Sequence, residues 1–133
     1  MTLDTHEENY LDTAEGRKLP VVHCVRNTPG WTLDEGIAAA LEGKDITVVE
    51  KPTFASLQLP ALIGAAAGDE PYTLELIGLC TDICVISNAL VLKTSFPEAP
   101  ISVDATCCAG VTPELHLAAP AAMRSCQIEI LNR

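Results

Sequence analysis

Cys84 is the residue of this chain whose type and position most favour chemistry. The apolar run Leu74–Leu79 is typical of a buried strand, and Cys84 follows it in the first turn of a helix predicted over residues 83–93. At that place unbonded N–H groups and the positive end of the helix dipole favour a thiolate and can hold an oxyanion. Most free cysteines are instead small buried side chains. Position alone therefore leaves a nucleophile and a packing role open.

Lys51 is the second candidate, because it directly follows the short β-branched run Ile46–Glu50. An ammonium beside a cysteine stabilises both the thiolate and the negative charge that develops during attack. A lone lysine after a strand is, however, usually a solvated side chain. Both interpretations of Lys51 stay open at this point.

Asp4, His6 and His23 form a third group of candidates, for metal binding. Residues two apart in an extended chain point to the same side, so Asp4 and His6 can face one ligand. A distant histidine such as His23 would complete a set of two imidazoles and one carboxylate, which suits a divalent metal with open positions. An Asp-x-His spacing is common, and His23 can equally be a structural histidine, so this pattern does not establish a metal site.

These side chains need strands and helices to bring them together, and the hydrophobic pattern alternates between the two from about residue 44. Strands are predicted at residues 46–50, 74–79, 101–104 and 127–131, and helices at 53–63, 83–93 and 113–124. This alternation predicts a parallel sheet that is covered by helices on both faces. The first 43 residues are expected to be irregular, with one possible strand at residues 21–25 and the tail of another at Thr2-Leu3.

Prolines and caps refine the helix predictions. Thr112 is placed to cap the helix over 113–124, and Pro113 suits its first position. Pro60 is expected to interrupt the helix over 53–63. Pro120 falls in the middle of the last helix, where a proline removes a hydrogen bond and clashes, so we expect a kink or a break there.

Ligands of open parallel sheets bind beyond the carboxyl ends of the strands. The residues that follow the predicted strands are therefore expected to share one edge of the sheet: Lys51, Cys80, Cys84, Asp104, Cys107, and the Asp4 and His6 pair. The cysteines Cys24, Cys107, Cys108 and Cys126 are expected to be packing residues, as is Cys80 unless its backbone has a role.

Composition excludes several classes of function. The 133 residues suit one domain, and eight basic against eighteen acidic residues give a net charge of −10. That charge argues against a nucleic-acid binder and against docking to anionic lipid. No apolar run is long enough to span a bilayer, and the acidic start has no signal-peptide pattern. We therefore expect a cytoplasmic protein whose six cysteines stay reduced.

The segment around Cys84 resembles the isochorismatase-like cysteine hydrolases, the superfamily that contains nicotinamidase and N-carbamoylsarcosine amidohydrolase. The run Leu76–Val85 is similar to the nucleophile segment of that family, and Cys84 matches the nucleophile. The bond from Leu79 to Cys80 matches a cis peptide that presents N–H groups for the oxyanion hole. Lys51, within Glu50–Phe54, matches the catalytic lysine.

The resemblance extends to the metal ligands of nicotinamidases and covers nearly the whole chain. Asp4 and His6 match the first two ligands, and His23, within the run His23–Trp31, matches the third. The resemblance implies a three-layer α/β/α fold with a mostly parallel sheet, over a single domain at residues 1–133. It also implies a divalent metal (zinc, iron or manganese), a small-molecule amide substrate and a homo-oligomer. The reaction implied is hydrolysis of an amide to an acid and ammonia through a thioester on Cys84.

Two departures from the family pattern qualify this interpretation. The family's general base is an aspartate in an Asp-x-Gln motif on the first strand, and this chain has no Asp-x-Gln. Relative to the family, the first strand and its helix are expected to be missing, and Asp82 and Asp104 are the only other carboxylates predicted near the same edge. Thr5 and the run Glu7–Tyr10 also replace an aromatic residue and a proline that nicotinamidases carry, which puts nicotinamide itself in doubt.

Three functions stay open from the sequence. The first is a nicotinamidase-like cysteine amidohydrolase. The second is a catalytically inactive family member that binds a small ligand or a protein partner. The third is a metal-independent amidohydrolase that acts on a ureido or carbamoyl group.

The missing base yields a first prediction. Without a carboxylate in the place of the Asp-x-Gln aspartate, the purified 133-residue chain should release little or no ammonia from simple carboxamides. A coupled ammonia assay over several hours measures this. Robust turnover by this chain would contradict the prediction.

Overall fold

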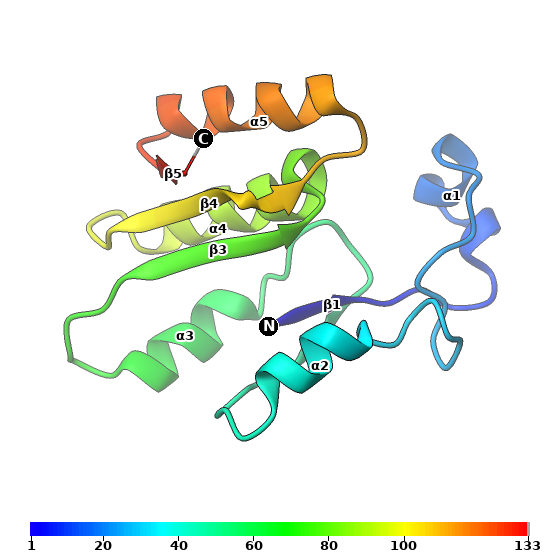
Figure 1. Ribbon diagram of the computed structural model, residues 1–133, viewed down its shortest axis with the longest axis horizontal. Helices are drawn as coiled ribbons and strands as arrows, with labels where there is room; N and C mark the ends of the chain where they lie inside the picture. The colour runs from blue at the N-terminus through cyan, green and yellow to red at the C-terminus, as the bar shows by residue number, and fades with distance from the viewer. Residues whose placement is uncertain (133) are drawn as a thin grey trace. The chain divides into compact units, whose positions relative to one another are not determined.

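Parallel strands pair in two separate sheets in the computed structural model, which describes residues 1–132 (Figure 1). One sheet contains β1 (Thr2–Asp4) and β2 (Val49–Lys51), and the other contains β3 (Leu74–Leu79), β4 (Ile101–Ala109) and β5 (Glu129–Leu131). The chain divides accordingly into two compact units, Met1–Thr53 and Phe54–Arg133. The mixed α/β class with parallel strands is therefore confirmed, whereas the single domain over residues 1–133 stays a prediction.

The first unit holds short helices around its two-stranded sheet. A 3₁₀ turn (Tyr10–Asp12) and α1 (Ala14–Lys18) follow β1, and α2 (Glu35–Leu41) precedes β2. The Thr13 hydroxyl accepts from the Gly16 N–H and caps α1, and the Asp34 carboxylate caps α2. The expectation that residues 1–43 are irregular is therefore wrong for these helices, whose caps define them. The strand expected at residues 21–25 is reduced to one bridge between His6 and Val25.

Gly16 explains why α1 can fold back against the 3₁₀ turn. A side-chain carbon at this position would lie 2.1 Å from the Tyr10 carbonyl oxygen, closer than real contacts allow. Tyr10 itself is fully buried, and its hydroxyl donates to the Leu19 carbonyl at 3.0 Å. The glycine thus permits a close approach that encloses Tyr10, the only buried Phe, Trp or Tyr side chain among residues 1–132.

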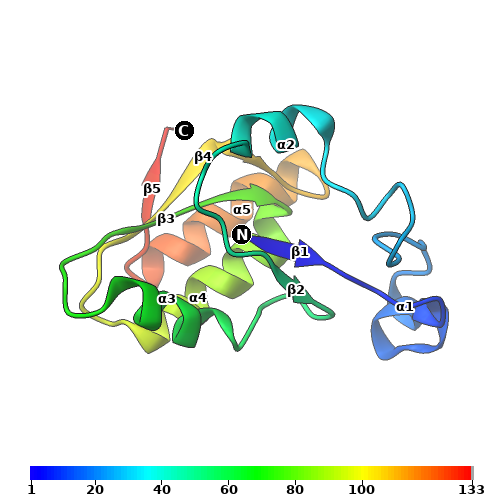
Figure 2. The ribbon, with the colours of Figure 1, turned by 90° about the horizontal axis from the view of Figure 1, so that it is seen from below.

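Over residues 54–132 the second unit contains three α-helices, a π-helical turn and one three-stranded sheet in the order β3-β4-β5 (Figure 2). Its helices are α3 (Leu59–Ala67), α4 (Ile86–Ser95) and α5 (Pro113–Ser125). Apolar side chains of α4, β4 and α5 form one core, whose buried members are Val85, Ala89, Leu92, Ile101, Val103, Ala119, Met123 and Ile128. Residues of α3 and β3 pack against the same core, so the helices and strands of this unit share one apolar centre.

Both prolines that were expected to disturb helices are accommodated. Pro60 lies in the first turn of α3, where its missing N–H has no helical partner to lose, so it begins the helix instead of interrupting it. Pro120 lies inside α5, which continues from Pro113 to Ser125, so the expected break is wrong. Because Pro120 is buried beside Ala119 and Met123, packing against the core offsets the lost hydrogen bond.

None of the helices among residues 1–132 combines the length and the apolar character that crossing a bilayer requires.

Asp104 on β4 links the end of the second unit to its sheet and yields a pH prediction. Its carboxylate accepts from Asn132 Nδ2 at 2.8 Å and from the Thr106 hydroxyl at 2.8 Å and N–H at 3.0 Å. These bonds lower the pKa of Asp104, those from Asn132 most. A carboxyl group whose pKa is lowered by folding stabilises the fold above about pH 4 and loses that contribution as the pH falls further.

Wild type should therefore lose more stability between pH 7 and pH 3 than Asp104→Asn does. Urea unfolding at both pH values measures the difference, and Asp69→Asn, at an exposed position, is the matched control. An equal acid-induced loss in wild type and Asp104→Asn would show that these bonds do not couple to protonation.

Candidate functional site

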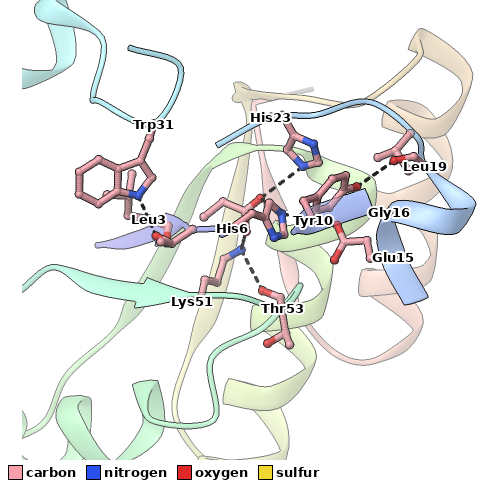
Figure 3. A network of polar contacts seen from close by, with 12 residues as sticks. Leu3, His6, Tyr10, Glu15, Gly16, Leu19, His23, Trp31, Lys51 and Thr53 are labelled. Atoms are coloured by element: carbon pink, nitrogen blue, oxygen red, sulfur yellow. Dashed lines mark hydrogen bonds and ion pairs between the residues drawn. The ribbon is translucent and has the colours of Figure 1, made fainter. Parts of the chain in front are cut away.

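Asp4, His6 and His23 lie together in the first unit, as a cluster whose possible ligand atoms are within 4.8 Å of one another. Figure 3 shows the two imidazoles beside the Tyr10 ring. Asp4 Oδ2 is 3.5 Å from His6 Nε2 and 3.7 Å from His23 Nε2. His6 is buried, while Asp4 and His23 are partly exposed. The structure thus brings together the three residues that the sequence singled out for metal binding.

Backbone hydrogen bonds on both sides of the chain hold this cluster. On one side β1 pairs with β2, with Asp4 opposite Lys51, and the Thr5 N–H donates to the Lys51 carbonyl at 2.9 Å. On the other side the His6 N–H donates to the Cys24 carbonyl, and the His6 carbonyl accepts from the Arg26 N–H, both at 2.9 Å. The segment that carries His23 therefore runs alongside the segment that carries Asp4 and His6.

The imidazole nitrogens are arranged as a metal site requires. His23 Nδ1 lies 2.7 Å from the Val21 carbonyl, so it carries the proton that it donates, and Nε2 is left as the acceptor that faces Asp4. His6 Nε2 is buried and has no hydrogen-bond partner. A buried polar atom in this condition is costly unless a ligand satisfies it. The donor set of two imidazoles and one carboxylate therefore fits a divalent ion such as zinc, iron or manganese.

Two neighbours of this cluster were not identified from the sequence. Glu15 Oε1, on α1, lies 3.8 Å from His6 Nε2. The Tyr10 ring packs against both imidazoles, with centroids 4.5 Å from His6 and 5.0 Å from His23. Burial, and then the charges of Glu15 and Asp4, raise the pKa of the Tyr10 phenol. The cap at Thr13 is the sequence signal that could have predicted α1, and with it the return of Glu15 towards His6.

Lys51 is buried, with 3% of its surface exposed, and its ammonium is held by oxygen atoms. Lys51 Nζ donates to Asp4 Oδ1 at 3.1 Å and to the Thr53 carbonyl at 3.0 Å. A buried ammonium is tolerated when it is paired and hydrogen-bonded in this way. Asp4 therefore serves both groups of candidates, since one carboxylate oxygen faces the lysine and the other faces the histidines.

In the second unit Cys84 lies in a π-helical turn, Thr81–Val85, that connects β3 to α4. This differs from the helix predicted to begin at residue 83, because α4 begins only at Ile86. The Leu79–Cys80 peptide bond before the turn is cis, as the resemblance implies. The Cys80 carbonyl accepts from the N–H groups of Ile83 and Val85, both at 3.1 Å.

Side chains fix this turn from three directions. Asn88 Nδ2 donates to the Cys84 carbonyl at 2.8 Å, and Asn88 Oδ1 accepts from the Ser56 N–H at 3.0 Å. The Thr81 hydroxyl is 2.8 Å from His116 Nδ1, on α5. Asp82 Oδ1 accepts from the Val111 N–H at 3.0 Å. The position of Cys84 is therefore set by tertiary contacts that its own segment does not encode.

The carboxylates that were weighed as substitute bases have structural partners. Asp82 binds the backbone of Val111, and Asp104 lies within β4, bonded to Thr106 and Asn132. These bonds favour a structural role for both residues. Among the other cysteines, Cys107 and Cys126 are exposed, so the packing role expected for them is wrong. Cys108 is partly buried, and burial raises the pKa of its thiol.

The chain matches the model of the isochorismatase domain over residues 1–133. No match is found among curated protein sequences.

Several solved structures share the fold at low sequence identity. The nicotinamidase of Bacillus subtilis is 22% identical, with a TM-score of 0.80 over 99% of this chain and 73% of that one. The pyrazinamidase of Pyrococcus horikoshii, solved in complex with zinc, is 21% identical, with a TM-score of 0.76 over the same shares of the two chains. The yeast nicotinamidase, bound to the inhibitor nicotinaldehyde, is 15% identical, with a TM-score of 0.81 over 99% of this chain and 78% of that one.

The donor set predicts zinc-dependent stability. A ligand that binds only the folded state stabilises it by about 2.7 kcal/mol at a concentration 100 times its Kd. Zinc should therefore raise the unfolding temperature of wild type, and this rise should be lost in His6→Ala and in His23→Ala. His116, the chain's third histidine, lies outside the cluster, so His116→Ala is the control. An equal rise in wild type and all three variants would mean that zinc binds elsewhere.

Proposed function

Because the chain belongs to the isochorismatase family, we propose that its site is that of a hydrolase that cleaves the carboxamide of a small molecule with a cysteine nucleophile. Turnover by these 133 residues is expected to be small or absent, because they contain no Asp-x-Gln base. The cluster of Asp4, His6 and His23 is the observation that carries this proposal. Structures of the same fold come from nicotinamidases and a pyrazinamidase, one of them a zinc complex. A cluster that fits zinc in this fold favours an amide substrate whose other end offers a Lewis base.

The proposed reaction passes through a thioester on Cys84. The thiolate sulfur attacks the carboxamide carbon, and the C–N bond breaks as the nitrogen takes up the thiol proton and leaves as ammonia. Water then adds to the thioester, which releases the carboxylic acid and returns the thiol. Each turn converts one amide and one water into one acid and one ammonia, so no further reactant is required.

Two groups of this chain are assigned to the charges that develop. Backbone N–H groups of the Leu79–Cys84 segment, at Cys80 and Cys84, would hold the oxyanion of the tetrahedral intermediate. The Lys51 ammonium would stabilise the thiolate and the developing negative charge. The bonds from Lys51 to Asp4 and to the Thr53 carbonyl support this role, because they hold the amine nitrogen in one orientation.

Asp4, His6 and His23 would hold a divalent ion, with Glu15 the nearest further carboxylate. When bound, such an ion supplies a Lewis acid that anchors an electron pair of the substrate. The chain's own residues orient this site, since the Tyr10 ring packs on both imidazoles. We further propose that the protein acts in the cytoplasm as a homo-oligomer, and that residues 1–133 form one domain.

A second candidate function is a ligand-binding family member without catalysis. This function is favoured because carboxylates that could act as a general base already have structural partners. Asp82 accepts from a backbone N–H, Asp104 accepts from Asn132, and Asp4 accepts from Lys51. Such a protein would bind the amide at the same residues and release it unchanged. The metal-independent ureido hydrolase is disfavoured by the fit of the Asp4, His6 and His23 cluster to a metal.

Thiol reactivity separates the two candidates without requiring turnover. Cys84, which is half-buried, should react with iodoacetamide at neutral pH at least about 10-fold faster than the exposed Cys107 and Cys126, because an activated thiolate reacts where a thiol does not. Peptide mapping by mass spectrometry measures all six rates in one sample, so the exposed cysteines are internal controls.

Substitution of the lysine tests the assigned role of its charge. Lys51→Met should slow the labelling of Cys84, and Lys93→Met, which removes an ammonium bonded to the Pro97 carbonyl, should leave it unchanged. If Cys84 reacts no faster than Cys107, an activated nucleophile is excluded and the binding function is favoured.

A further inference from the structure

Thr5 is a buried residue between two of the three residues of the metal-ligand cluster, with 4% of its surface exposed. In an extended chain successive side chains alternate, so the Thr5 side chain points away from the side that Asp4 and His6 share. Its hydroxyl donates to the Leu3 carbonyl at 3.1 Å and accepts from the Trp31 indole N–H at 2.9 Å. The rear of the ligand segment is therefore bonded to a residue 26 positions later.

The loop that carries Trp31 is itself firmly held. The Thr28 N–H donates to the Val25 carbonyl at 3.1 Å, and the Trp31 N–H donates to the Thr28 carbonyl at 3.0 Å. These two turns bring the indole back to the Asp4–His6 segment, with which the loop also pairs through the bridge between Val25 and His6. The loop thus begins at His23, a candidate ligand, and ends at a bond to the residue between the other two.

Arg26 connects the same loop to β2 and to the segment that follows β1. Its guanidinium pairs with Glu7 at 3.0 Å and with Glu50 at 2.5 Å, and it lies 5.9 Å from the centroid of the Trp31 ring. The hydrogen bonds that the guanidinium donates to Glu50, and then to Glu7, raise the pKa of Arg26. A guanidinium over an indole face adds a cation–π attraction, so Trp31 is held on its ring and at its N–H.

We propose that Trp31 is a positioning residue for the metal-ligand cluster and acts through the Thr5 hydroxyl. The bond fixes the Asp4–His6 segment from behind, so that Asp4 and His6 keep one geometry relative to His23. This inference rests on the metal site of the proposed function. Groups that orient metal ligands typically change metal affinity by about 10- to 100-fold when they are removed.

The hydroxyl of Thr5 is specific for this role. It uses its donor towards Leu3 and an acceptor position towards Trp31, so neither a methyl group nor an amine of the same size replaces it. Loss of the indole N–H would leave the buried Thr5 oxygen without this donor, and the segment would gain freedom at the ligands.

Trp31 also provides its own signal, because it is the only tryptophan of the chain. Its indole N–H is bonded to Thr5, which lies between the candidate ligands Asp4 and His6. A shift of the Asp4–His6 segment on zinc binding would therefore change this hydrogen bond and the polarity around the indole ring. Zinc should therefore shift or quench the intrinsic fluorescence of wild type, and Thr5→Val should reduce that response.

A double-mutant cycle on the full chain tests the inference. Zinc affinity is measured by competition with a chromophoric chelator for wild type, Thr5→Val, Trp31→Phe and the double variant, and the visible spectrum of bound Co²⁺ reports the ligand geometry. Each single variant should lose about 10-fold in affinity and change the cobalt spectrum. The double variant should lose no more than either single, since both remove one bond.

Two further variants separate this role from general destabilisation. Thr5→Ser keeps the hydroxyl and should restore the affinity and the cobalt spectrum. Thr32→Val removes a hydroxyl of the same loop that donates to the Pro29 carbonyl. This variant should change neither the zinc affinity nor the cobalt spectrum. If Thr5→Val does not fold, Trp31→Phe against Thr32→Val decides the question.

The possible failures are distinct. Zinc binding that is lost in His23→Ala but unchanged in Trp31→Phe and Thr5→Val would overturn the positioning role and leave the metal site intact. Additive losses in the double variant would also overturn it, because they show two independent effects. Wild type that binds no zinc would overturn this inference together with the metal part of the proposed function.

Discussion

The Asp4 carboxylate is the group on which the candidate site of the first unit depends. One oxygen accepts from the buried Lys51 ammonium, and the other faces the imidazoles of His6 and His23. Burial of a cation without a partner would strongly destabilise the fold, so the Asp4 carboxylate is needed for Lys51 to be buried. The pairing of β1 with β2 sets this contact directly, because it places Asp4 opposite Lys51.

The parts of the fold that the sequence predicted are those whose signals are local. Leu74–Leu79, apolar except for Glu75, forms β3 with those bounds, and the cap at Thr112 begins α5 as expected. The burial expected for this strand is wrong, because alternate residues such as Ile77 and Leu79 are exposed. The helices of five and seven residues after Thr13 and Asp34 were missed, because they are too short for a helical period to show. Propensity also misjudged Pro120, since burial against the core outweighed it.

The candidate site divides in the same way. The spacing of Asp4 and His6 predicts that they share a side, and residue order at strand ends pointed to Lys51 and Cys84. Glu15 and Tyr10 approach the histidines only because Gly16 lets α1 pack closely on the preceding turn. The π-helical turn at Cys84 depends on Asn88 and His116, which reach it from α4 and α5. Contacts of this kind arise between elements and leave no periodic pattern.

The pairing of β1 with β2 has an entropic consequence for folding. Asp4 and Lys51 are 47 residues apart, and closing a loop of that length costs roughly 3 kcal/mol of chain entropy plus a constant. The β3–β4 pair joins Leu74 to Ile101 across a shorter segment in which α4 forms. Since long-range closures slow folding, we expect the three-stranded sheet to form early and the loop of residues 4–51 to close late. A ligand bound at Asp4 would then stabilise the closed loop, so that folding of the first unit and binding at its site are thermodynamically coupled.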